Sequence, residues 1–267
     1  MSRKFSPGVF ALQTFVVIFF VFMLAPILVV FVASFGARDY VSFPMDGFSL
    51  KWYRRVYEYK PFLNSLVFSI QLAIASTILA GLLGVPAGLA LSRARSNFGQ
   101  FLTMFLLAPL SIPLIVFGLA LLYYMSLLGF GIGFWPLLIG HAAVGLPYIV
   151  RTVTAVHRSL DVGIEESASI LGATKWQIVR HVTLPLIRSA MFAGFLFCML
   201  SSLDNLTISF FFGTATTSTL PVVMLSYLEY QFDPSIAAIG VIQMLLTVIV
   251  LLVVDRVYGL GKLNIAD

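Results

Sequence analysis

Residues 165–185 read EESASILGATKWQIVRHVTLP and form a polar stretch in a chain that is otherwise apolar. The stretch combines two acidic and three basic side chains with a glycine at position 172 and a Leu-Pro pair at its end. Of the 267 residues, 60% are hydrophobic and 10% are charged, whereas about a quarter of the residues in soluble domains are charged. The chain is therefore expected to lie in a membrane, and a polar stretch retained there predicts contact with something soluble.

Six long apolar runs predict an all-α integral membrane fold, because a helix of about 20 apolar residues can cross the bilayer. The first run follows Arg3 and Lys4, as in a signal peptide. It continues too far without a cleavage site and is therefore expected to be a retained helix. The chain is expected to be one transmembrane domain, 1–267, with its core at about 62–258. The expected spans are 9–35, 62–91, 101–127, 134–156, 190–212 and 236–254.

The distribution of lysine and arginine predicts the orientation in the membrane. If both termini are cytoplasmic, 11 of the 16 basic residues lie inside and five lie outside, in agreement with the positive-inside rule. The five outer ones all fall in the loop 36–61, which makes that loop an imperfection of the pattern. Its tryptophan and tyrosines predict a short helix along the membrane surface. This topology places residues 165–185 in the cytoplasm.

Within the polar stretch, the sequence predicts two short helices. Asp161 can cap a helix over 165–171, and Gly172 can end it in the left-handed conformation. A second helix is expected from Thr174 until Pro185. Small residues at 167–169 and 173 would let a partner approach closely. Helical periodicity alone leaves two alternatives open: a rigid elbow that protrudes toward a partner, or an amphipathic segment that rests on the bilayer.

The spacing of the motif favours the elbow. The chain resembles the permease subunits of bacterial ABC importers, whose signature loop reads Glu-Ala-Ala, three residues, Gly, nine residues and Ile-x-Leu-Pro. Here Glu166-Ser167-Ala168, Gly172 and Val182-Thr183-Leu184-Pro185 stand at that spacing, with serine and valine as mild departures. The resemblance implies the type I importer permease fold, with a cytoplasmic coupling helix at about 158–188, between spans four and five, seated in a groove of an ATPase. The implied coupling residues are Glu165, Glu166, Ala168, Leu171, Gly172, Ala173, Leu184 and Pro185.

The same resemblance implies the partners. They are a second homologous permease in an expected heterodimer, two ATPase subunits, an extracytoplasmic solute-binding protein and the lipid of a bacterial inner membrane. ATP and Mg are expected in the ATPase, while this chain is expected to need no cofactor or metal and to bind no nucleic acid. The sequence contains no G-x-x-x-x-G-K-[ST] motif and no arrangement of catalytic residues, so it is not expected to be an enzyme.

Further motifs between 64 and 240 resemble one branch of the family, the second permease of spermidine/putrescine-type importers. The branch predicts a small organic cation such as a polyamine as the solute. An opine, an amino-acid derivative or a phosphonate is the alternative within the same class, and a stand-alone channel or secondary transporter is the alternative from another class. The matching motifs are Asn64-Ser65-Leu66, His141 with Leu146-Pro147-Tyr148, Leu171-Gly172-Ala173, Ser202-Leu203-Asp204-Asn205 with Phe211 and Gly213, and Leu220-Pro221.

Asp204 is expected inside the fifth span, where an unpaired carboxylate would be costly. It is expected either to face the solute path and attract a cation, or to help cap a broken helix. The family often has a second aspartate where this chain has Asn205, so the case for a strongly dicationic solute is weaker. His141 is expected to be a hydrogen-bonded structural residue, since no second metal-binding side chain stands at ligand spacing. The expected path residues are Asp204, Asn205, Ser201, Ser202 and Tyr148.

Overall fold

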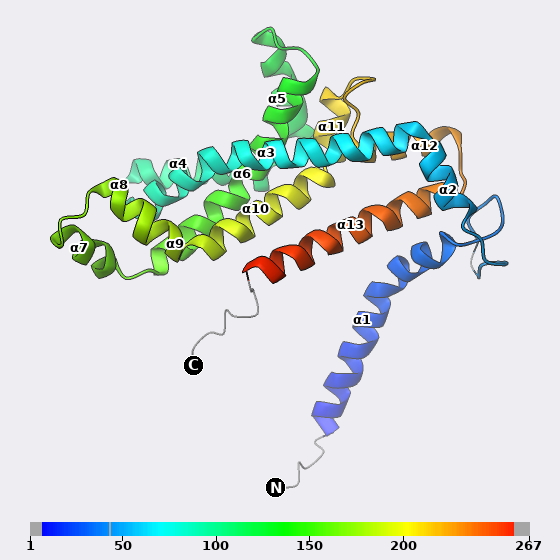
Figure 1. Cartoon of the computed structure of the whole chain (residues 1–267), viewed down its shortest axis with the longest axis horizontal. Helices are drawn as coiled ribbons and strands as arrows, with labels where there is room; N and C mark the ends of the chain where they lie inside the picture. The colour runs from blue at the N-terminus through cyan, green and yellow to red at the C-terminus, as the bar shows by residue number, and fades with distance from the viewer. Residues whose placement is uncertain (1–6, 43, 259–267) are drawn as a thin grey trace. The chain divides into compact units, whose positions relative to one another are not determined.

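The computed structural model describes residues 7–42 and 44–258, and most of this part is helical. The described residues contain no strand beyond an isolated β-bridge between Gly36 and Phe48. The predicted all-α class is thereby confirmed. The helices (Figure 1) are α1 (Pro7–Ala33), α2 (Lys51–Glu58), α3 (Lys60–Ser92), α4 (Asn97–Leu107), η1 (Ala108–Leu110), α5 (Leu114–Leu127), α6 (Phe134–Ser159), α7 (Val162–Ile170), α8 (Lys175–Ile178), η2 (Val179–Thr183), α9 (Leu184–Leu186), α10 (Arg188–Leu203), α11 (Leu206–Phe212), α12 (Leu220–Tyr230) and α13 (Ser235–Tyr258).

Four helices of the described chain are long and apolar enough to cross a membrane: α1, α3, α6 and α13. Two bent helix pairs raise the number to six if each pair is counted as one span. The most apolar window of α1 is 0% buried within the chain. Such a surface requires contact with lipid or with another protein, because exposing apolar side chains to water has an unfavourable free energy.

Two predicted spans are interrupted in the structure. The span predicted at 101–127 consists of α4 with η1 and then α5, bent by 107°. The bend follows from Pro109 and Pro113, because proline lacks the backbone N–H that a continuous helix requires. The span predicted at 190–212 is broken as well, which was the alternative left open for Asp204: α10 ends at Leu203 and α11 begins at Leu206.

The described residues divide into two compact units. One contains the chain up to Leu63 together with Met224–Leu246. In this unit a short helix is present in the loop 36–61 as α2, and its buried Trp52 donates a hydrogen bond from Nε1 to the carbonyl of Gly36 at 2.8 Å. Tyr227 packs against Tyr59 and Phe62, with ring centroids 5.3 and 4.9 Å away.

The other unit contains Asn64–Val223 and the chain from Thr247. Close packing of α3 against α6 is possible because α3 carries glycines on the contact face. A Cβ added at Gly88 would lie 2.8 Å from Val153 Cγ1, and one at Gly84 would lie 3.1 Å from Ile149 Cγ2. A Cβ added at Gly194 of α10 would lie 2.9 Å from the Cα of Ile149. These contacts pack α3 and α10 against α6, which holds the segment 162–186 at one end of the unit.

Candidate functional site

The segment 161–186, here called the elbow, begins with a capped helix. The Asp161 side chain accepts a hydrogen bond from the backbone N–H of Gly163 and caps α7. At the other end, Gly172 has a φ of +87°, in the left-handed region that glycine occupies at little cost. The predicted cap and the predicted glycine stop are both confirmed.

The return limb of the elbow is also fixed by local hydrogen bonds. The hydroxyl of Thr174 accepts from the N–H of Gln177, while the Gln177 side chain accepts from the N–H of Thr174, which forms a capping box. After the short α8, the chain widens into the π-helical turn η2 before the Leu184–Pro185 pair. The predicted second helix is therefore present, although it changes from α-helical to π-helical winding at Val179.

Large apolar side chains project from the bend of the elbow. Ile170 is 86% exposed, Leu171 is 87% exposed and Trp176 is 67% exposed. Glu166 is exposed as well, while Ala168 and Ala173 are half-buried. An exposed apolar cluster rimmed by polar residues is typical of a surface that binds another protein.

Glu165 does not share this outward direction. Its Oε1 accepts hydrogen bonds from Thr183 Oγ1 at 2.6 Å and His157 Nε2 at 3.0 Å. Its Oε2 lies 3.9 Å from Nη2 of Arg93. Partial burial opposes ionisation, but these hydrogen bonds and the electrostatic attraction of His157 and Arg93 outweigh it, so the pKa of the Glu165 carboxyl is held below its ordinary value. The structure thus separates Glu165 from its neighbour Glu166.

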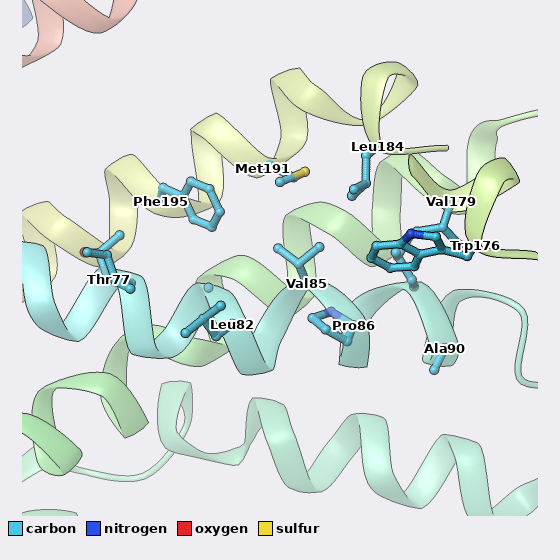
Figure 2. Close-up of a pocket in the computed structure, with 13 residues that line it drawn as sticks. Thr77, Leu82, Val85, Pro86, Ala90, Trp176, Val179, Leu184, Met191 and Phe195 are labelled. Carbon is cyan, nitrogen blue, oxygen red and sulfur yellow. The ribbon is translucent and has the colours of Figure 1, made fainter. Parts of the chain in front are cut away.

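Between the elbow and the adjoining helices lies an apolar groove of about 810 Å³. Figure 2 shows Trp176 and Val179 of the elbow on one side, with Val85, Pro86 and Ala90 of α3 facing them. Leu184, predicted as a coupling residue, also lines this groove, whereas Pro185 is exposed. The return limb therefore faces α3 across an apolar space.

The predicted path residues lie around the break between α10 and α11. Asn205 caps α11, since its Oδ1 accepts from the N–H of Ile208 at 3.0 Å. Asp204 is exposed, and no side-chain hydrogen bond or ion pair of its carboxylate occurs among the described residues. Asn205 is thus the residue that caps α11, and the carboxylate of Asp204 beside it is not used in the cap.

A buried polar cluster supports this break. His141 is 1% exposed, and its two ring nitrogens lie 2.7 Å from Ser202 Oγ and 3.0 Å from Ser209 Oγ. Ser76 donates from its hydroxyl to Ser202 Oγ at 3.2 Å. His141 is therefore a structural, hydrogen-bonded residue, as predicted, and it joins α6 to the helices on both sides of the break.

The remaining predicted path residues differ in their surroundings. Ser202 is buried in the cluster just described, while Ser201 is half-buried. Tyr148 is half-buried and stacks on Phe197, with ring centroids 6.2 Å apart. The structure brings Ser202 and Asn205 together at the break but gives both a structural partner. Sequence reasoning missed Ser76, Ser209, His157 and Arg93, because single polar residues in apolar or basic stretches carry no motif. It also missed Thr183, which occupies the unspecified position of the Ile-x-Leu-Pro motif.

Comparison with known proteins identifies the chain. Residues 80–260 match the family described as binding-protein-dependent transport system inner membrane component. The chain belongs to this family. It is similar to the spermidine/putrescine transport system permease protein PotC of Escherichia coli (strain K12), at 29% identity over 238 residues, which cover 89% of this chain and 90% of that protein. It is also similar to the putrescine transport system permease protein PotI of the same strain, at 30% identity over 233 residues, covering 83% and 81%.

The fold is that of this family as well. A bacterial ABC transporter involved in the import of the acidic polysaccharide alginate contains a chain that matches with a TM-score of 0.74 at 19% identity. The match covers 96% of the present chain and 100% of that one. The protein is a permease subunit of an ABC importer, a multi-pass component of the inner membrane, and its relatives are transport permeases rather than enzymes.

Proposed function

We propose that the elbow of this permease is its coupling contact with a cytoplasmic ATPase. The exposed side chains of Ile170 and Leu171 carry this proposal, because two large apolar groups directly before the Gly172 bend offer a surface for insertion into a partner's groove. Glu166 and the small residues beside them lie on the same segment. The proposed assembly contains a second, related permease, two ATPase subunits that hold ATP and Mg, and an extracytoplasmic binding protein, with both termini of this chain in the cytoplasm.

Replacement of Gly172 tests the coupling contact. A Cβ at this position would meet no atom within 4 Å, so the cost of a substitution comes from the φ of +87°. Gly172→Val is expected to distort the bend and to abolish ATPase association in pull-down and ATP-driven uptake in vesicles, since a β-branched residue is a genuine outlier at positive φ. Gly172→Asn is the matched control, because asparagine tolerates this conformation better. Wild-type association and uptake in Gly172→Val would contradict the proposal.

The proposed solute is a small organic cation of the polyamine class. The relatives named above support it, since PotC and PotI are spermidine/putrescine and putrescine permeases at 29% and 30% identity. The exposed carboxylate of Asp204, placed at a helix break, supplies a charge of the right sign. The alginate importer shows that the same fold also occurs in a system with an acidic solute, so the local charge has to be tested directly.

Asp204→Asn tests the charge without changing the size of the side chain. Uptake of labelled putrescine and spermidine by the assembled importer is expected to slow by about tenfold or more, because hydrogen bonds to charged groups contribute about 1.5–3 kcal/mol. Assembly with the ATPase is expected to be unchanged. Unaltered polyamine uptake would remove Asp204 from the path, and an importer that takes up an opine, amino-acid derivative or phosphonate instead would contradict the polyamine assignment.

A further inference from the structure

The carboxylate of Glu165 joins four separate segments of the chain. It belongs to α7, its hydrogen-bond partners Thr183 and His157 belong to η2 and α6, and Arg93 directly follows α3. We call these four residues the Glu165 clamp. Thr183 is 2% exposed and His157 is 4% exposed, so the two hydrogen bonds are shielded from water. Charge-assisted hydrogen bonds in such surroundings are about twice as strong as neutral ones.

The helix ends to which the clamp attaches are themselves bonded to each other. Arg158 of α6 donates from Nε to the carbonyl of Ser92 at 3.1 Å and from Nη2 to that of Leu91 at 3.3 Å. In return, Arg93 donates from Nη2 to the carbonyl of Leu160 at 3.3 Å. These bonds satisfy carbonyls that a helix end leaves without partners. The ends of α3 and α6 are therefore cross-linked in both directions.

His157 extends the clamp into this pair of helix ends. A carboxylate only accepts hydrogen bonds, so Nε2 of His157 is protonated and donates the hydrogen bond to Glu165. The other ring nitrogen, Nδ1, lies 2.5 Å from Ser92 Oγ at the end of α3. One imidazole thus bridges α3 and α7.

On the other limb of the elbow, Leu184 packs against the buried core cluster that contains Val85 of α3 and Val153 of α6. Trp176 and Val179 face α3 across the groove of about 810 Å³ shown in Figure 2, and Trp176 is 67% exposed. An open groove lacks the interdigitated contacts through which packed side chains transmit a displacement. The clamp therefore adds a polar connection, made from α7, to the apolar contact of Leu184 at the end of the return limb.

We infer that Glu165 is a positioning residue that fastens the elbow to the cross-linked ends of α3 and α6, so that a displacement of the elbow moves both helices together. This inference rests on the proposed coupling role of the elbow. It assigns to Glu165 a task different from that of Glu166: Glu166 faces the partner, and Glu165 transmits the partner's motion into the membrane-crossing helices.

The first test measures how firmly the elbow is held in the purified chain alone. Hydrogen–deuterium exchange of the amides at 162–178 is expected to accelerate roughly tenfold in Thr183→Val, which keeps the shape of the side chain but loses the hydroxyl donor. Glu165→Gln is expected to act in the same direction. Thr183→Ser retains the donor and is expected to remain near the wild-type rate, and Glu229→Gln, an exposed carboxylate on α12, controls for the loss of a charge. Unchanged exchange in both Glu165→Gln and Thr183→Val would overturn the clamp.

The second test measures transmission in the assembled importer. The solute transported per ATP hydrolysed is expected to fall by about two- to thirtyfold in Glu165→Gln and Thr183→Val, the range of mutational effects on coupling between sites. ATPase association is expected to be retained, because the exposed bend is unchanged, and Thr183→Ser is expected to restore the ratio. An unchanged ratio despite faster exchange would overturn the transmission role. If Gly172→Val leaves ATPase association intact while the exchange results hold, the coupling proposal fails and the clamp as a local fastening stands.

Discussion

At the scale of single residues, two adjacent carboxylates have opposite environments. Glu166 is exposed on the elbow, while Glu165 is bonded inward to Thr183 and His157. The sequence motif predicted both at the partner contact, because spacing places a residue on a helix but does not give the direction of its side chain. The inward direction depends on Thr183, 18 residues further along the chain, and no local pattern contains that information.

The lowered pKa of Glu165 predicts how the elbow responds to pH. A carboxyl whose folded pKa lies below its ordinary value of 4.5 stabilises the fold above that value. The stabilisation is lost as the pH falls through the lower folded pKa. The apparent unfolding midpoint of the wild type in detergent is therefore expected to exceed that of Glu165→Gln at neutral pH, and the two are expected to converge in acid. A difference between them that is independent of pH would show that the ionised form is not the stabilising one.

At the scale of helices, the glycines of α3 determine how closely it approaches α6. Gly81, Gly84 and Gly88 allow close contact, since added Cβ atoms would lie 2.9, 3.1 and 2.8 Å from side chains of the facing helices. Helix interfaces in membranes use small residues in this way. The break between α10 and α11 was one of two alternatives that the sequence left open. Asn205 caps α11 within an apolar run that otherwise suggests a continuous span.

Gly88→Ala tests the contact between α3 and α6. The added methyl group would lie 2.8 Å from Val153 Cγ1 and 3.3 Å from the carbonyl of Val150, so one of the helices has to shift. Overpacking of this kind costs about 1–3 kcal/mol, and the apparent unfolding midpoint is expected to fall. Gly240→Ala is the matched control, because nothing lies within 4 Å of its added Cβ and alanine favours the helix by about 1 kcal/mol. A higher midpoint in Gly88→Ala would contradict the close contact.

At the scale of the whole molecule, composition and one motif were sufficient for the class of protein. Apolar runs predicted the helical membrane fold, and the spacing around Gly172 identified the importer permease family, which residues 80–260 confirm. The identity of the solute is harder to predict from the sequence. It depends on which polar groups stay unpaired once the chain has folded: Asn205 and Ser202 are used in structural bonds, whereas Asp204 is left exposed.

The π-helical turn Val179–Thr183 has a consequence for how this chain can vary. Such a turn holds one residue more than α-helical winding requires. Each residue advances an α-helix by about 100°, so the loss of one residue here would straighten the winding and rotate Thr183 by about 100° relative to α8. Its hydroxyl would then face away from Glu165. The number of residues in this turn therefore determines the direction in which the Thr183 side chain points relative to α8. In related chains, substitutions within 179–182 are expected to be tolerated far better than the insertion or deletion of a single residue.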